Sequence, residues 1–266
     1  MNRISRYGVA ISVMIAVLVP LVLLALWSVT GRWVYPDLLP SISFNNLVKW
    51  LGNSTLIEPL INSIILSILV TAISFGLGFY PSKYLGTKDF RGKRILQVFI
   101  MLPALAPGIA IVFGMLPVFV RLGIYGSYEA LLIGQVVFTL PYMIMTLTAS
   151  FKNYDTDYED QSVTLGMGKI DTLLNVTIPM IKSSIAVGCM YTFMVSWSMY
   201  LFTSMYSPRG FSTLATKLFP LLSMGVTPMQ EIAVFTIAFF LPSLIFLIGS
   251  TLVIRSDNIN ERGGHL

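Results

Sequence analysis

Residues 59–82 read PLINSIILSILVTAISFGLGFYPS, twenty-four consecutive positions without a charged side chain. A helix rises about 1.5 Å per residue, so about 20 apolar residues cross a hydrocarbon core roughly 30 Å thick. The stretch therefore predicts a transmembrane helix, and a chain built around it folds in a bilayer rather than in water.

The composition of the whole chain points to the same solvent. Hydrophobic residues make up 55% of the 266 positions, charged residues only 11%, and the mean hydropathy is +0.79. Soluble domains carry about 25% charged residues. We therefore expect an all-α integral membrane protein, a single transmembrane domain over 1–266 with six transmembrane helices. The runs that are long and apolar enough lie at about 7–29, 59–82, 95–120, 130–151, 183–204 and 232–254.

The basic residues indicate the orientation of these helices. The run at 7–29 is longer than the apolar part of a signal peptide and no A-x-A-like cleavage site follows it, so we interpret it as a span. With a cytoplasmic N-terminus, 12 of the 17 basic residues fall on the cytoplasmic side and 5 outside. Because cytoplasmic loops carry the excess of Lys and Arg, both termini are expected in the cytoplasm and the loops 30–57 and 205–227 outside. This topology accounts for the net charge of +5 without a nucleic-acid partner.

Several classes of chemistry lack their residues in this sequence. The one cysteine, Cys189, leaves no intrachain disulfide, and the one histidine, His265, has no cluster of metal ligands around it. No catalytic set of nucleophile, base and orienting acid can be assembled, and no G-x-x-x-x-G-K-[ST] phosphate loop is present. We therefore expect no enzyme activity and no bound cofactor or metal; any ATP hydrolysis is expected on another chain.

Acidic residues avoid the predicted membrane interior. Glu58, Glu129 and Glu231 stand at the expected outer ends of three spans, within reach of water. A proton- or sodium-coupled carrier usually places an ionisable group at mid-depth. The pattern argues against a secondary transporter, although carbonyl groups of broken helices also bind sodium.

Residues 101–114, MLPALAPGIAIVFG, place two prolines and two glycines in one predicted span. Proline removes a helix hydrogen bond and kinks the helix, and membrane helices tolerate this where neighbours or a cavity satisfy the freed carbonyl groups. The cluster favours a bent helix beside a pathway.

The most specific stretch joins the fourth and fifth runs, where residues 158–179 read YEDQSVTLGMGKIDTLLNVTIP. The spacing of Thr156 and Glu159 predicts a capping box and a short helix over about 157–165, which Gly166 and Gly168 end. A second short helix is expected to place four residues on one face, at Ile170, Leu173, Leu174 and Thr177. From the residues alone, this helix–glycine turn–helix is equally an amphipathic element lying on lipid headgroups.

At these residues the chain resembles the permease subunits of binding-protein-dependent ABC importers. Their cytoplasmic EAA loop reads roughly E-A-A-x-x-x-G-A-S and ends, about nine residues later, in an apolar residue and a proline. Its Glu falls on Asp160, its Gly on Gly166 and its Pro on Pro179, while Gln161 and Ser162 replace the two alanines. Asn62-Ser63, the proline-rich third run and Leu140-Pro141-Tyr142 extend the resemblance over about 58–250. It is greatest to the group serving polyamines, iron(III), thiamine and aminophosphonates.

The resemblance implies a type I importer permease and a coupling role for the loop 153–180. The loop would seat in a groove of a separate ATPase subunit, which holds ATP and Mg, with Glu159 or Asp160 facing basic groups there. Glu159 adjoins the motif position, so the sequence leaves the choice open. The residues implied in ATPase coupling are Glu159, Asp160, Leu165, Gly166, Ile170, Leu173 and Pro179.

The remaining partners follow from the same resemblance. Six helices supply half of a pore, so a second permease, which we expect to be non-identical, completes it. An extracytoplasmic binding protein would deliver a small polar solute to the outer loops, and alternating access would move it across a bacterial cytoplasmic (inner) membrane. The substrate itself is not indicated.

The fifth run contains a polar and aromatic band that is a candidate lining of the pathway. Hydroxyl groups in membrane helices also serve packing between helices, and the sequence leaves both interpretations open. The candidate residues are Ser196, Trp197, Ser198, Tyr200 and Thr203. The alternative to the importer permease is a secondary transporter or channel that acts without an ATPase.

Overall fold

The computed structural model describes residues 3–31, 41–44, 48, 52, 54–225 and 228–263. Regular structure in these residues is helical, with one isolated antiparallel bridge between Thr30 and Ile42. Most of the first expected outer loop, at 32–40, 45–47, 49–51 and 53, and His265 lie outside the described residues.

The chain divides into two compact units, and the first is made of the described parts of 1–62 and 212–242. It holds α1 (Arg3–Ser28), α12 (Leu214–Met224) and the first parts of α3 (Ser54–Thr87) and α13 (Met229–Gly263). Two side-chain amides join its segments: Asn62 donates to the Ser212 carbonyl oxygen at 3.1 Å, and Gln230 donates to that of Gly31 at 2.8 Å.

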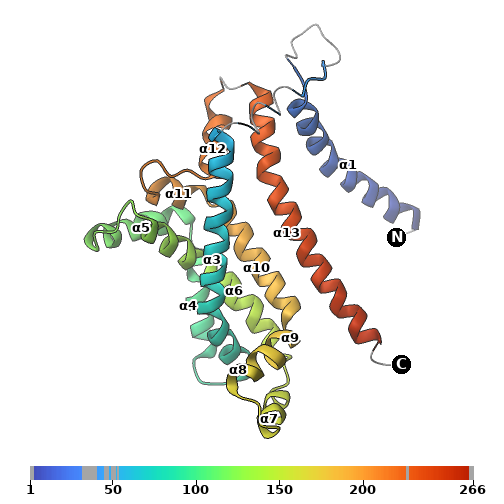
Figure 1. Ribbon diagram of the computed structural model, residues 1–266, viewed down its shortest axis with the longest axis vertical. Helices are drawn as coiled ribbons and strands as arrows, with labels where there is room; N and C mark the ends of the chain where they lie inside the picture. The colour runs from blue at the N-terminus through green and yellow to red at the C-terminus, as the bar shows by residue number, and fades with distance from the viewer. Residues whose placement is uncertain are drawn as a thin grey trace. The chain divides into compact units, whose positions relative to one another are not determined.

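The second unit, 63–211 and 243–266, is organised around α6 (Tyr128–Phe151). This helix begins at Ser127, whose hydroxyl accepts from the Ala130 amide at 3.3 Å, and its buried residues run from Ala130 to Phe151. Besides α3, described below, it packs against helices on both sides of it in the sequence. They are α4 (Lys93–Leu105), α5 (Gly108–Arg121), α10 (Lys182–Trp197) and α11 (Tyr200–Tyr206). Figure 1 shows α6 near α4 and α10.

Helix α3 lies along α6 at very short range. The Ser82 hydroxyl donates to the Ile144 carbonyl oxygen at 3.1 Å, and the hydroxyl groups of Ser74 and Thr139 lie 3.1 Å apart. At Gly86 the two helices are so close that an added Cβ would lie 2.2 Å from the Cβ of Phe151 and 2.8 Å from its carbonyl carbon. Glycine is therefore required here by packing against backbone, not by its own backbone conformation.

The described residues contain three helices long and apolar enough to cross a membrane: α3, α6 and residues 229–251 of α13. Two further apolar helix pairs are sharply bent, and counting each as one span gives up to five. One pair, α4 and α5, is bent by 97° around Ala106 and Pro107, in the run that was expected to bend. The expected total of six spans remains a prediction.

The fifth apolar run is also interrupted, because α10 ends at Trp197 and α11 begins at Tyr200. A fully buried amide, Gln135 on α6, bridges the break. Its Oε1 accepts from the Ser196 hydroxyl at 2.6 Å and its Nε2 donates to the Thr203 hydroxyl at 3.1 Å. One side chain thus holds both sides of the interruption.

We expect Gly86→Ala to destabilise the second unit by about 1–3 kcal/mol, because the new methyl group meets the Phe151 backbone, which cannot move aside as a side chain would. Gly76→Ala in the same helix is the matched control, since nothing lies within 4 Å of the position that its new methyl group would take. Thermal unfolding in detergent measures both; equal midpoints for the two variants would contradict the close contact.

We expect Gln135→Leu, which preserves volume approximately, to cost about 1 kcal/mol by removing the partner of two buried hydroxyl groups. Gln161→Leu, at an exposed position, is the control and should leave the unfolding midpoint unchanged. A loss no greater than the control's would show that the amide does not support the helix break.

Candidate functional site

The predicted short helix and glycine turn are present in the 153–180 loop. Helix α7 (Asp157–Thr164) agrees with the expected 157–165. It ends at Gly166, whose φ of +89° lies in the left-handed region. The Gly166 amide donates to the Val163 carbonyl oxygen at 2.9 Å and the Met167 amide to that of Ser162 at 3.0 Å, a Schellman motif. Gly168 differs from the prediction: it has an extended backbone and begins α8 (Lys169–Thr172) instead of ending α7.

The predicted capping box is wrong. Thr156 has a helical backbone, and its side chain makes no capping hydrogen bond to the described first turn of α7. Glu159 does not reach back to Thr156, because its carboxylate accepts hydrogen bonds from one ammonium group and two hydroxyl groups elsewhere in the chain. A carboxylate accepts more strongly from an ammonium group than from a backbone amide, so the tertiary contact wins over the local one.

Glu159 is the centre of a cluster that we call the Glu159 cluster, formed with Lys83, Tyr154 and Thr177. Lys83 Nζ lies 2.7 Å from Oε1 and 2.6 Å from Oε2 of Glu159. The Tyr154 hydroxyl donates to Oε1 at 2.6 Å and the Thr177 hydroxyl donates to the same oxygen at 2.7 Å. The cluster joins α3, the end of the α6–α7 connection, the first turn of α7 and the end of the loop.

The surroundings of Glu159 favour its charged form. Burial alone would raise the pKa of this carboxyl group, but the hydrogen bonds from Lys83, Tyr154 and Thr177, with the Lys83 charge, outweigh burial and hold the pKa below its ordinary value. The stabilisation is therefore complete at neutral pH and is lost as the pH falls through the folded-state pKa. Burial and the bond to Glu159 raise the pKa of Tyr154, which remains a donor.

The second half of the loop is not the regular helix that was expected. Residues Leu173–Thr177 form a π turn, in which the Ile178 amide bonds to the Leu173 carbonyl oxygen five residues back. A π turn holds residues five apart on one face, so Thr172 and Thr177 are both buried. The predicted single face is therefore wrong: Ile170 and Leu174 are exposed, whereas Thr177 points inward.

A second internal bond closes the loop on itself. The hydroxyl groups of Ser162 and Thr172 lie 2.8 Å apart and are buried, and the Ser162 hydroxyl also reaches the Glu159 carbonyl oxygen at 2.8 Å. Ser162 occupies a position where the family pattern has alanine. Like alanine, Ser162 has a small side chain that is buried here, and its hydroxyl group adds a hydrogen bond between α7 and α8.

The outer surface of the loop is apolar and acidic. Leu165 is 84% exposed and Ile170 71% exposed, unusual values for large aliphatic side chains. Asp160 is exposed beside Leu165 and lines a shallow hollow of about 510 Å³ on α7. Gly166 and Pro179 are also exposed, and Leu173 is half-buried. Of the two candidate carboxylates, Asp160 faces outward and Glu159 faces the chain's own helices.

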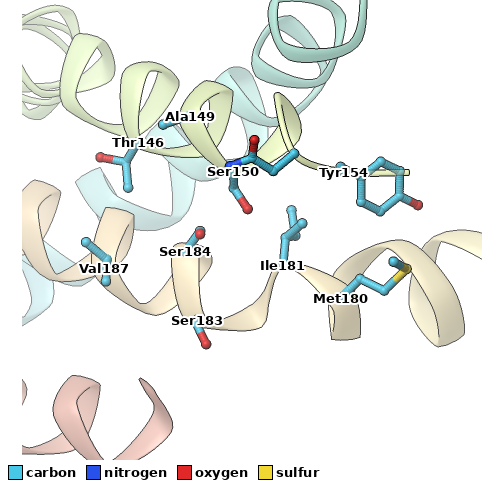
Figure 2. Close-up of a pocket in the computed structure, with 10 residues that line it drawn as sticks. Thr146, Ala149, Ser150, Tyr154, Met180, Ile181, Ser183, Ser184 and Val187 are labelled. Carbon is cyan, nitrogen blue, oxygen red and sulfur yellow. The ribbon is translucent and has the colours of Figure 1, made fainter. Parts of the chain in front are cut away.

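A second hollow, of about 580 Å³, lies beside the loop between the end of α6 and residues 180–187. Figure 2 shows Ser150 on α6 and Ser184 on α10 on its facing walls. Its described lining carries hydroxyl, amide and apolar groups, and none of these side chains is charged. Ser183 and Ser184 supply part of this polar lining.

The candidate pathway residues of the fifth run separate into two groups. Ser196 and Thr203 are buried around Gln135, and Trp197 is 3% exposed and stacks on Phe193 with ring centroids 5.8 Å apart. Ser198 is exposed and Tyr200 half-buried, at the break between α10 and α11.

Sequence reasoning missed three residues of these sites. Lys83 was counted only as one of the basic residues that set orientation, nothing in the local pattern distinguished Tyr154, and Gln135 was passed over. A glutamine in an otherwise apolar span was the one available signal, because a buried amide needs partners.

Comparisons with known proteins agree with the geometry. A family model described as the inner membrane component of binding-protein-dependent transport systems matches residues 72–263. The spermidine/putrescine transport system permease protein PotC of Haemophilus influenzae is 24% identical over 216 residues, 81% of this chain and 83% of that protein. The molybdate/tungstate permease protein WtpB of Pyrococcus abyssi is 30% identical over 148 residues, 56% of this chain and 59% of that protein.

Two solved structures have a similar fold. A bacterial ABC transporter involved in the import of the acidic polysaccharide alginate gives a TM-score of 0.69 at 17% identity, covering 96% of this chain and 98% of that chain. The methionine ABC transporter MetNI in an inward-facing conformation gives a TM-score of 0.60 at 12% identity, covering 80% of this chain and 98% of that chain. With most of its spanning region matched by the family model, this chain belongs to the inner membrane components of binding-protein-dependent transport systems, the permease subunits of ABC importers.

Proposed function

We propose that this chain is one permease subunit of an ATP-driven importer in a bacterial cytoplasmic membrane. It pairs with a second, non-identical permease, receives a small polar solute from an extracytoplasmic binding protein, and passes it inward by alternating access. ATP and Mg are held by separate ATPase subunits, which contact the 153–180 loop. Family membership supports the permease assignment, and the exposed acidic and apolar surface of the loop supports the ATPase contact.

The observation that carries this proposal is that two adjacent carboxylates have different surroundings. Glu159 is occupied by three donors of its own chain, while Asp160 lies exposed next to Leu165. Large apolar side chains that stay exposed on an ordered loop mark a protein contact, and an acidic group beside them selects a basic partner surface. We therefore assign the contact with the ATPase to Asp160, Leu165 and Ile170.

The proposed orientation has support from the same cluster. Because Lys83 contacts Glu159, the basic segment 83–94 and the 153–180 loop lie at one end of the second unit. Both were assigned to the cytoplasmic side, one by charge and the other by resemblance. Their proximity favours the topology with cytoplasmic termini.

The pathway is proposed to pass the break between α10 and α11, with Ser198 and Tyr200 as its accessible members. Ser196, Trp197 and Thr203 would shape it from behind by packing. The relatives are named for different solutes, spermidine and putrescine for one and molybdate or tungstate for the other. This variety accords with selection of the substrate by the binding protein.

We expect Asp160→Asn to lower recovery of the ATPase in an affinity pull-down of the tagged chain about tenfold, the equivalent of about 1.4 kcal/mol for one lost charge contact at the interface. Asp155→Asn, which removes an equal charge from an exposed position before α7, is the control and should recover the ATPase normally. A wild-type chain that is recovered alone, with uptake insensitive to vanadate, would move the assignment to a secondary transporter or channel.

We expect Gly166→Val to abolish ATP-driven uptake while the chain still inserts, because a β-branched residue is strongly disfavoured at a φ of +89° and the turn between α7 and α8 is lost. Gly168→Val is the matched control, since its backbone at φ −70° and ψ 162° accepts a β-branched residue, and the atom near its new Cβ, Asp171 Oδ2 at 3.1 Å, belongs to a flexible side chain that can turn away. Uptake assays in cells, normalised to membrane content, compare the two. Equal uptake by both variants would show that the turn is dispensable.

A further inference from the structure

The Glu159–Lys83 pair connects two parts of the chain that the sequence separates by 76 residues. Lys83 lies on α3 one turn before its end at Thr87, and Glu159 lies in the first turn of α7. Their side chains are 26% and 19% exposed. A pair this sheltered is screened by salt far less than an exposed one, and additional hydrogen bonds fix its geometry.

Most of the acceptor capacity of the carboxylate is used inside the chain, with three hydrogen bonds on Oε1 and one on Oε2. An ionised carboxylate offers about four acceptor positions. Lys83 contacts both oxygens, and Tyr154 and Thr177 both donate to Oε1, so four hydrogen bonds from three side chains reach Glu159. A cation of another protein would have to displace these donors, whereas Asp160 next to it stands exposed.

Without this cluster, α7 would be joined to the membrane helices indirectly, through its two chain connections and through its contacts with the later part of the loop, such as the Ser162–Thr172 bond. The later part of the loop has a hydrophobic attachment, because Leu173 and Ile178 pack on the core formed by Phe79, Phe151 and Ile181. Helix α7 has mostly polar residues, and Ser162 is its buried member in the described structure. The Glu159 cluster therefore supplies the direct attachment of α7 to α3.

The attachment leads into a stiff pair of helices. Gly86, three residues after Lys83, is in contact with the Phe151 backbone. Ser82, the residue before Lys83, donates a hydrogen bond to the Ile144 carbonyl oxygen. A displacement of α7 would thus move the end of α3, and α3 cannot move there without α6.

From this geometry we propose that Glu159 is a positioning residue, and that its ion pair with Lys83 is a latch transmitting motion of the coupling loop to α3. The proposal rests on the proposed function and refines it: Asp160 and the apolar residues contact the ATPase, while Glu159 converts that contact into movement of the membrane helices. Loss of the latch then uncouples ATP hydrolysis from transport without preventing assembly.

The test uses the whole importer, purified with its ATPase and reconstituted in proteoliposomes with the binding protein. Two quantities are measured: ATPase recovered with the tagged permease, and solute transported per ATP hydrolysed. Glu159→Gln and Lys83→Met should keep ATPase recovery within about twofold and lower transport per ATP about tenfold. Lys83→Arg, which preserves charge and donors, should retain most of the coupling.

Two controls make the outcome specific. Lys88→Met removes an equal charge from an exposed position in the same basic segment and should couple normally. The double variant Lys83→Met/Glu159→Gln should transport no worse than either single variant, because two residues that act through one contact are not additive.

Three results would overturn the latch. Normal transport per ATP in Lys83→Met and Glu159→Gln would show that the pair transmits no motion. If the losses of transport per ATP in the two single variants multiply in the double variant, the residues act separately. Loss of ATPase recovery by Glu159→Gln equal to that of Asp160→Asn would place Glu159 in the ATPase contact. Failure of the proposed function is distinct, since the wild-type chain would then recover no ATPase at all.

Discussion

The close contact between α3 and α6 is the constraint on which the rest of the second unit depends. In a bilayer the association of helices gains little from hydrophobic burial, because lipid is as apolar as the side chains, so close packing and polar contacts must supply it. Gly78 and Gly86 let the two backbones approach, and Ser74 and Ser82 add hydrogen bonds along the seam. This seam fixes where α3 ends, and therefore where Lys83 meets the loop.

Most buried polar side chains described in this unit bond to one another or to backbone carbonyl groups; the hydroxyl groups of Ser67, Thr148 and Thr192 are the exceptions. Gln135 is the clearest case, since a buried amide in an apolar medium is costly without partners. By bonding to Ser196 and Thr203 it stabilises an interruption of helical structure that lipid alone would not tolerate. Tyr206 adds a further link by donating to the Val112 carbonyl oxygen, which ties α11 to α5 beyond the bend at Pro107.

Some local features were predicted correctly from the sequence, others were not, and the long-range contacts were not predicted at all. Helix α7 and the turn at Gly166 follow from residues close in the chain, and the prolines of 101–114 indicated a bend. The capping box failed because Glu159 had a better partner in Lys83, which pairs with it across 76 residues. The prediction of a single face on the second short helix was wrong because periodicity arguments assume 3.6 residues per turn. The sequence pattern gives no sign of a π turn. Spacing identified Asp160 as the motif carboxylate, but only the folded structure shows that Glu159 is bonded within the chain whereas Asp160 is exposed.

The π turn at Leu173–Thr177 also sets the angular register between α8 and α9 (Ile178–Met180), which is followed by a bend of 78° into α10. Such a turn is equivalent to one residue inserted in an α-helix, and each helical residue corresponds to about 100° of rotation. Shortening or lengthening this segment by one residue would therefore rotate the exposed side chains of Ile170 and Leu165 around the helix axis. The amino acids themselves would stay the same. The number of residues between the glycine turn and Pro179 is then a geometric quantity: it sets the direction in which the exposed side chains point without changing the side chains themselves.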